Sequence, residues 1–227
     1  MKKKQKALLL SICALLLVAV SVFGTYAYLT DKDVVTNTFT VGAVGLSLDE
    51  AEVNLDGTYK NGHDVRVKSN TYKLLPGHTY YKDPTVTVDA GSEDAYVRMI
   101  VKVERVDQLK LALPYSDGSE YYSNDGNKTF LFQKLCGNWD SATWLYEGYT
   151  ESENRQDGYY EFRYKEIVTR SDNATVLDDL FETINIPGDI DNTKLTYLSN
   201  LKIIVNAHAI QADGFTNADA AWAAFGE

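Results

Sequence analysis

Apolar and polar residues alternate along most of this chain, as they do in half-buried β-strands. The alternation is clearest over residues 95–104, where every second residue is apolar. Residues 84–103 are therefore predicted to form a hairpin with its turn at residues 89–94. Pro84 suits the start of the first strand, because proline cannot donate a ladder hydrogen bond. Residues 201–209 alternate in the same way and predict a last long strand.

Shorter stretches predict the remaining strands. They are expected at residues 44–48, 64–68, 72–75 and 159–168. Residues 176–186 fit either a strand or one turn of helix, because their apolar residues match both spacings. We therefore predict an all-β fold, a single antiparallel β-sandwich of jelly-roll or immunoglobulin-like type.

One long segment departs from the strand pattern. Residues 109–175 are expected to form an irregular insertion on one end of the sandwich. Two short strands are predicted inside it, near residues 129–134 and 143–147, in addition to the strand at 159–168.

The C-terminal segment, residues 215–226, is predicted to be a short helix. Thr216 or Asn217 can cap its first turn, since both carry a side-chain oxygen that accepts from backbone N–H groups. Trp222 and Phe225 fall on its apolar stripe. We expect these two rings to plug one end of the sandwich.

The first 27 residues are typical of a signal peptide. Four lysines precede an apolar run at residues 7–20, and the small residues Thr25 and Ala27 occupy the −3 and −1 positions of a cleavage site before Tyr28. The alternative is an uncleaved membrane anchor, since the apolar run is near the minimum length for spanning. Cleavage leaves a mature β-sandwich domain of residues 28–227.

A strand pattern opens the mature chain with no linker before it. Val35, Phe39 and Val41 share one face, and threonines occupy the other. Gly42 and Gly45 follow as a plausible hinge. The N-terminal strand region, residues 28–48, is therefore a candidate donor strand that can pair with its own sheet or with the sheet of another molecule.

The chain is acidic. Its formal net charge is −10, and residues 1–27 hold four lysines and no acid, so the mature chain carries −14. Such a charge disfavours binding to nucleic acid. Cys13 leaves with the signal peptide, and Cys136 then has no intramolecular partner, which excludes a disulfide framework.

The sequence holds no recognisable catalytic motif. Its three histidines, His63, His78 and His208, lie far apart, whereas the common zinc proteases place two histidines one helical turn apart. We expect all three to be solvated surface residues, and we expect no metal and no other cofactor. Calcium is the one ion left open, at the oxygen-rich residues Asp189, Asp191 and Asn192.

Several short segments resemble the TasA/camelysin family of secreted Gram-positive proteins. Residues 26–31 (YAYLTD) and 37–42 (NTFTVG) match the start of that family. Residues 72–77, 82–86 and 209–215 fit its clostridial branch. The resemblance implies an extracellular β-sandwich that builds biofilm fibres, with processing by the signal peptidase SipW. The camelysin name also carries a metalloprotease label.

Three functions remain open at this point. The leading hypothesis is a secreted fibre or biofilm-matrix subunit, not an enzyme, whose partners are itself or sister subunits and a SipW-like peptidase. It would lie in the extracellular matrix or at the cell surface and touch the membrane only through an uncleaved signal peptide. A monomeric surface adhesin or carbohydrate-binding module is the alternative, suggested by the 16 tyrosines, many of them in pairs. A camelysin-like metalloprotease is disfavoured, because the zinc motif is missing.

Overall fold

The computed structural model describes residues 30–33, 44–113, 135–199 and 201–226. Its strands, in chain order, are β1 (Thr30–Asp33), β2 (Leu46–Ala51), β3 (Arg66–Val67), β4 (Thr79–Tyr81), β5 (Thr85–Val88), β6 (Ala95–Glu104), β7 (Cys136–Gly137), β8 (Trp144–Glu151), β9 (Gly158–Tyr164), β10 (Thr175–Val176), β11 (Thr183–Asn185) and β12 (Lys202–Gln211). Its helices are α2 (Val106–Ala112), α3 (Asn192–Tyr197) and α4 (Ala218–Ala224). No helix within these ranges is long and apolar enough to cross a membrane.

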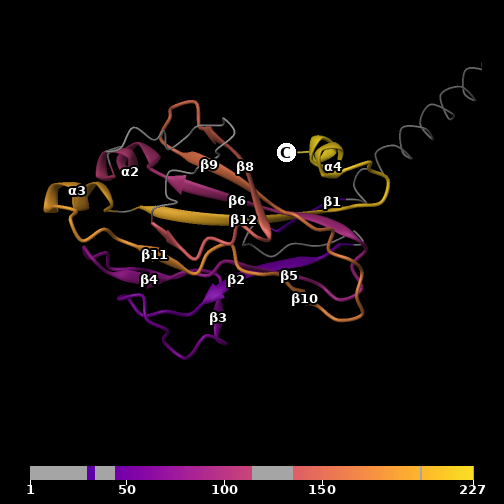
Figure 1. Ribbon diagram of the computed structural model, residues 1–227, viewed down its shortest axis with the longest axis horizontal. Coiled ribbons are helices and arrows are strands. Elements are labelled where there is room, and N and C mark those ends of the chain that lie inside the picture. Colours follow the sequence, from indigo (N-terminus) through magenta and orange to yellow (C-terminus); the bar gives the residue numbers. More distant parts are fainter. Residues whose placement is uncertain (1–29, 34–43, 114–134, 200, 227) are drawn as a thin grey trace, which may run out of the picture.

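The strands form three antiparallel sheets. The largest has the order β1-β12-β6-β9-β8, the second β10-β5-β2-β3, and the smallest β4-β11-β7. Figure 1 shows the five-stranded sheet as one layer, with β2, β5 and β10 in the layer facing it. The predicted all-β sandwich with a short C-terminal helix is confirmed.

The alternation in β6 gives the core its regularity. Every second residue of β6, from Ala95 to Val103, is buried, and the residues between are half-buried on the other face. β12 runs antiparallel to β6 over ten residue pairs, with Val205 opposite Val101. In an antiparallel pair, opposite residues face the same side, so the two central strands present one continuous apolar surface.

The predicted hairpin over residues 84–103 is wrong, although its inward-facing residues are right. β5 pairs with β2 and β10, whereas β6 pairs with β12 and β9. The turn between β5 and β6 therefore carries the chain from one sheet to the other. Strands on facing sheets show the same alternation as strands in one hairpin, because both bury every second residue in the same core.

Two other predictions also change. Residues 72–75 form no strand. Lys73 N–H donates to Leu55 O in a turn (2.7 Å), and Leu75 N–H donates to the side-chain hydroxyl of Tyr80 in β4 (2.6 Å). Residues 176–186 contain the strands β10 and β11, which belong to different sheets.

Much of the predicted irregular insertion is regular sheet. β8 and β9 lie within residues 109–175, and both belong to the five-stranded sheet, with Phe162 of β9 opposite Met99 of β6. The strand predicted near 143–147 is the start of β8. The strand predicted near 129–134 falls outside the described residues.

The C-terminal helix forms as predicted, but it lies elsewhere. Asn217 is its cap, since its Oδ1 accepts from Ala220 N–H (2.9 Å). Trp222 and Phe225 do not plug an end of the sandwich. They form a separate apolar cluster with Ile210, and the Arg98 guanidinium lies 4.4 Å from the centre of the Trp222 ring. Their helix, α4, lies on the outer side of the five-stranded sheet (Figure 1).

Candidate functional site

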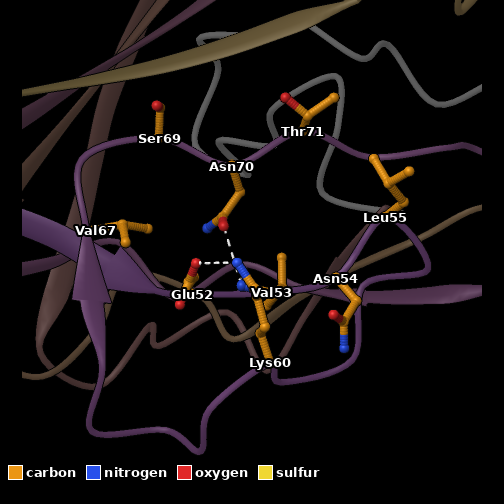
Figure 2. Close-up of a pocket in the computed structure, with 9 residues that line it drawn as sticks. All are labelled: Glu52, Val53, Asn54, Leu55, Lys60, Val67, Ser69, Asn70 and Thr71. Atoms are coloured by element: carbon orange, nitrogen blue, oxygen red, sulfur yellow. Dashed lines mark hydrogen bonds and ion pairs between the residues drawn. The ribbon is translucent and has the colours of Figure 1, made fainter.

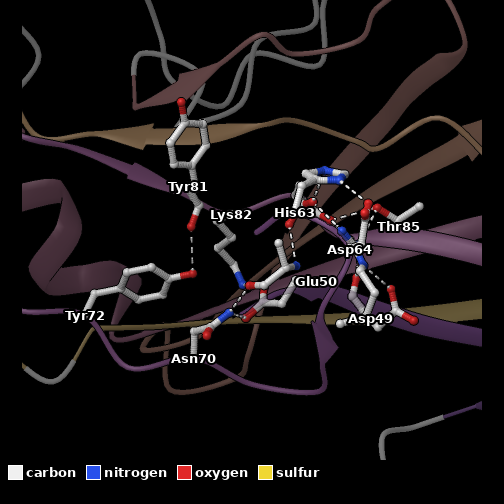
Figure 3. Close-up of polar contacts among 12 residues, drawn as sticks. Asp49, Glu50, His63, Asp64, Asn70, Tyr72, Tyr81, Lys82 and Thr85 are labelled. Atoms are coloured by element: carbon white, nitrogen blue, oxygen red, sulfur yellow. Dashed lines mark hydrogen bonds and ion pairs between the residues drawn. The ribbon is translucent and has the colours of Figure 1, made fainter. Parts of the chain in front are cut away.

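A group of buried charged side chains lies where β2, β3 and the segment after β4 meet (Figure 3). The buried polar and charged residues among those described are Glu50, Lys82, Asp83 and Ser92. The first three belong to this group. Buried charges are stable only when they are paired and hydrogen bonded, so their partners decide what this region can do.

The strand pattern explains why two of these charges point inward. Glu50 continues the inward series of Leu46 and Leu48 along β2. Lys82 follows Tyr80 by two residues, and both are buried while Tyr81 between them is exposed. Each charged residue thus takes a position where the alternation would place an apolar one.

One carboxylate joins three segments of the chain. Glu50 Oε2 pairs with the Lys82 ammonium group, and Glu50 Oε1 accepts from Asn70 Nδ2 (2.9 Å). We call Glu50, Lys82 and Asn70 the inner trio. Asn70 also donates to Ala51 O (2.8 Å) and accepts at Oδ1 from Val53 N–H (3.0 Å). Its amide thereby satisfies backbone groups at the end of β2.

A second buried carboxylate, Asp83, lies beside the inner trio and is 3% exposed. Its Oδ1 accepts from Ala51 N–H (2.8 Å), and its Oδ2 accepts from Arg66 Nη1 (2.5 Å). His63 Nε2 lies 3.1 Å from the same Oδ2 atom. Asp83 therefore has a backbone partner and a charged partner, as a buried carboxylate requires.

Arg66 of β3 holds this arrangement together. Besides Asp83, its guanidinium donates to Asp49 Oδ1 (2.8 Å) and to Thr85 Oγ1 (2.7 Å). Burial opposes its charge, but the hydrogen bonds and charges of Asp49 and Asp83 outweigh burial and leave the pKa of Arg66 raised. A planar guanidinium with five donors suits such a site, and an ammonium group would satisfy fewer of these acceptors.

Tyr72 covers the inner trio from one side (Figure 3). Its hydroxyl donates to Tyr81 O at 3.1 Å. Burial is the main cause that raises the pKa of Tyr72 well above its usual value, and the negative charges of Glu50 and Asp83 add to it. The Tyr72 hydroxyl therefore stays neutral.

A pocket of about 300 Å³ opens on the outer side of the same region (Figure 2). Glu52 and Lys60 line it on one side, and Asn70 and Thr71 line it on the other. Glu52 Oε1 pairs with Lys60 Nζ at 2.6 Å, and Glu52 Oε2 accepts from Asn61 Nδ2 at 2.8 Å. We call Glu52, Lys60 and Asn61 the outer trio, because the Lys60 side chain is 52% exposed.

The histidines do not form a zinc centre. His63 shares its Asp83 oxygen with the Arg66 guanidinium, whose positive charge repels a metal ion there. His208 Nδ1 accepts from Arg98 Nε (3.2 Å) on the outer face of the other sheet. His78 lies in an exposed turn near Tyr80. Across the described ranges, no group of three or more histidine, cysteine or acidic side chains is arranged to hold a metal ion.

The expectation that all three histidines are solvated surface residues holds only in part. His63 and His78 are exposed, whereas His208 is half-buried and its ring stacks on Phe225 at 5.1 Å. The outer face of β12 is not bare to water, because α4 covers it.

The residues considered for calcium have another structural role. Asp191 is the N-cap of α3, and its Oδ1 accepts from Lys194 N–H (2.8 Å). Asp189 and Asn192 lie on either side of it in exposed positions. A capping carboxylate turned toward the helix explains why this loop is rich in oxygen atoms.

Most residues predicted at the N-terminus lie outside the described residues. These are Thr25, Ala27, Tyr28, Val35, Phe39, Val41 and Gly42. Gly45 is described: its N–H donates to Ser92 Oγ (3.1 Å), and its carbonyl accepts from Asp89 N–H (2.8 Å). A side chain at Gly45 would meet Asp89 Oδ2 at 2.5 Å, so glycine allows the close approach of these two segments.

Sequence reasoning missed the inner trio and the Asp83 cluster. A usable signal existed, because Glu50 and Lys82 both stand at inward positions of an alternating strand pattern. Charged residues at such positions need partners. Which partners they meet could not be predicted, since Asn70 and Arg66 come from other segments.

The described part of the chain is an all-β sandwich whose buried charges are paired with one another. Its described residues contain no group arranged to hold a metal ion. Residues 1–70 match the family model described as camelysin metallo-endopeptidase. The predicted resemblance to the TasA/camelysin family is thus confirmed over these residues. No curated protein and no solved structure matched the chain.

The metallo-endopeptidase name and the site disagree. The matched segment contains His63, the one histidine near buried acids. That histidine faces an Asp83 oxygen already held by Arg66. The described residues do not fit a catalytic zinc centre, and we derive no step through one.

Proposed function

We propose that this chain is a secreted structural subunit that builds an extracellular fibre or biofilm matrix by donating its N-terminal strand. The observation that carries the proposal is the position of β1 at the edge of the five-stranded sheet, where among the described strands it pairs only with β12. An edge strand at the N-terminus can exchange its own sheet for that of a neighbouring copy through backbone hydrogen bonds.

The length of β12 supports this proposal. β1 pairs with residues 207–210 of β12, whereas β12 begins at Lys202. Residues 202–206 have β6 on one side and no described strand on the other. In the proposed fibre, the strand of the next copy replaces β1 and pairs along this whole edge of β12. The same antiparallel register would set Val35 opposite Val205, which is buried, so the predicted apolar face would point into the core.

The family match supports the secretion step of this proposal. The matched segment includes the predicted signal peptide, and cleavage between Ala27 and Tyr28 would free the strand from the membrane. We propose a SipW-like peptidase as the processing enzyme, and further copies or sister subunits as the assembly partners. N-terminal sequencing of the secreted protein tests the cleavage site. A start at Met1, or well inside the strand, would contradict it.

Fibre assembly is tested by electron microscopy of the protein isolated from the culture medium. Phe39→Asp should abolish fibres, because it sets an unpaired charge in the apolar groove that accepts the strand. Thr40→Asp is the matched control: it adds the same charge on the face predicted to be polar, and fibres should persist.

Peptide addition separates donation from a general loss of folding. A variant lacking residues 28–41 should remain folded and monomeric, and a synthetic peptide of residues 28–42 should bind it and raise its melting temperature. Fibres formed by the deletion variant would show that the strand is not required.

Two observations favour a second candidate, the monomeric adhesin or carbohydrate-binding module. β1 pairs with β12 of the same chain, as a monomer requires. Tyr59 and Tyr81 stack at 4.1 Å beside the charged cluster, which gives an aromatic surface of the kind that sugars pack against. A secreted chain that stays monomeric at high concentration and mildly acid pH would favour this candidate.

We also propose that the chain is not a protease, since Asp83, the buried acid beside His63, is held by Arg66. The purified secreted protein should carry no stoichiometric zinc and should not cleave casein. Casein cleavage that is lost on substituting His63, His78 or His208 would overturn this part of the proposal.

A further inference from the structure

The inner trio contains the parts of an amide-forming reaction. Glu50 binds an amine, Lys82 Nζ, with one carboxylate oxygen and a carboxamide, Asn70 Nδ2, with the other (Figure 3). The amine and the carboxamide are therefore within two hydrogen bonds of each other. We infer that Lys82 and Asn70 become joined by an intramolecular isopeptide bond, with Glu50 moving the proton.

Glu50 is placed to activate the nucleophile. A lysine attacks a carbonyl carbon only as the neutral amine, and the lysine ammonium group here donates directly to Glu50 Oε2. Transfer of one proton along this hydrogen bond leaves a neutral amine and a neutral carboxylic acid. The two groups are in direct contact and largely buried, since the Lys82 and Glu50 side chains are only 10% and 8% exposed.

The carboxamide of Asn70 is held as an electrophile. Its Oδ1 accepts from Val53 N–H at 3.0 Å, which is the position of a donor that stabilises the oxyanion as the amine attacks. Its Nδ2 donates to Glu50 Oε1 and to Ala51 O. The leaving nitrogen is therefore next to the carboxylic acid that carries the proton taken from Lys82.

The reaction balances without any oxidant or other reactant. A bond forms between Lys82 Nζ and Asn70 Cγ, and the bond between Asn70 Cγ and Nδ2 breaks. Glu50 takes two protons in turn from the Lys82 nitrogen and passes both to the leaving nitrogen, which departs as ammonium, and Glu50 ends as the carboxylate it was at the start. The new amide keeps an N–H group that can donate to Glu50.

The outer trio provides an internal comparison. Glu52 likewise holds a lysine and an asparagine, Lys60 and Asn61. The Lys60 side chain is 52% exposed, so water stabilises its ammonium form. In the described contacts, the Asn61 carbonyl oxygen accepts from no backbone N–H as Asn70 does from Val53. The outer trio should therefore stay unlinked.

Peptide mapping of the full secreted protein tests the inference. Trypsin cuts after Lys68, Lys73 and Arg98 but not after a linked Lys82, so the bond predicts one branched peptide that joins residues 69–73 to residues 74–98. Its mass should be lower than the sum of the two peptides by one ammonia. The intact protein should show the same loss.

Variants assign the roles. Lys82→Arg and Asn70→Ala should each retain the full mass, and Glu50→Gln should retain it because the amide cannot take the proton. Lys60→Arg is the control and should still lose one ammonia. A loss of ammonia that persists in Lys82→Arg would indicate an asparagine succinimide and would overturn the inference. The inference would also be overturned if folded wild-type protein keeps its full mass, with the Asn70 side-chain nitrogen retained, after prolonged incubation. This holds whatever the variants show.

Discussion

The inner and outer trios are each built from a glutamate, a lysine and an asparagine, and their glutamates, Glu50 and Glu52, are two residues apart at the end of β2. The two trios differ in their exposure to water. Lys82 and Glu50 have side chains 10% and 8% exposed, whereas those of Lys60 and Glu52 are 52% and 22% exposed. In the core, a charge without a partner costs several kcal/mol. At the surface, water replaces a lost partner. The same contacts therefore carry different weight in the two places.

This comparison also explains the neighbouring Asp83 cluster. Asp83 and Arg66 are connected to the inner trio through the backbone of Ala51. Ala51 N–H donates to Asp83, and Ala51 O accepts from Asn70. The inner trio and the Asp83–Arg66 pair together hold residues 63–72 against the end of β2 through hydrogen bonds and ion pairs. The outer trio fastens only the exposed turn at residues 60–61.

Removing the buried carboxylate of Asp83 should have the largest effect. Asp83→Ala leaves Arg66 without its closest anionic partner and Ala51 N–H without an acceptor. We expect the free energy of unfolding to fall by about 3–5 kcal/mol. Urea unfolding measures it. Asp64→Ala, which removes a fully exposed carboxylate near the same His63, is the control and should be close to wild type.

Loss of the inner carboxylate should have the next largest effect. Compared with protein in which Lys82 and Asn70 are not joined, Glu50→Ala removes the acceptor that both share, so two buried donors lose a partner. We expect a loss of about 2–3 kcal/mol in the free energy of unfolding. Glu52→Ala removes the equivalent group of the outer trio and should give no measurable change. Equal effects of the two substitutions would contradict the comparison.

Arg66→Lys tests whether geometry matters beyond charge. Lysine keeps the positive charge but cannot reach Asp49, Asp83 and Thr85 together. We expect a loss of about 1.5 kcal/mol, measured by urea unfolding. Arg105→Lys changes an exposed arginine that contacts Asp107 and should leave stability unaltered. If Arg66→Lys matches wild type as well, the charge alone is sufficient.

The smallest effect concerns the titration of the outer trio. Hydrogen bonds from Lys60, and then from Asn61, lower the pKa of Glu52 below its ordinary value of 4.5. A lowered pKa contributes stability above 4.5 that is lost as the pH falls through the folded value. NMR titration should show this lowered pKa, and Lys60→Met or high salt should move it back toward 4.5. An unchanged pKa in Lys60→Met would show that the ion pair does not form in solution.

The sequence predicted which face of each strand is buried better than it predicted which strands pair with each other. The alternation in β2, β6 and β12 identified which residues are buried. It could not show that β5 and β6 belong to different sheets, because both arrangements bury the same residues. It also placed Trp222 and Phe225 on one helix stripe but not on the outer face of the sheet.

From the sequence, only the existence of a buried polar site could be predicted, and its partners could not. Glu50 and Lys82 at inward positions required partners, but Asn70 and Asp83 could be chosen only by the packing of separate segments. The three histidines lie too far apart in the sequence for the common zinc motif. Their actual contacts, with Asp83 for His63 and with Arg98 for His208, depend on strand neighbours.

By itself, then, the sequence determined the local properties: the period-two burial of the strands, a capped start of α4 at Thr216 or Asn217, and the acidity of the chain. These depend on neighbouring residues alone. The tertiary structure decided which sheet each strand joins and which buried charges meet. The reason is physical, since an alternating pattern specifies a buried face, while a hydrogen bond or ion pair needs two atoms within about 3 Å of each other and so depends on how distant segments pack.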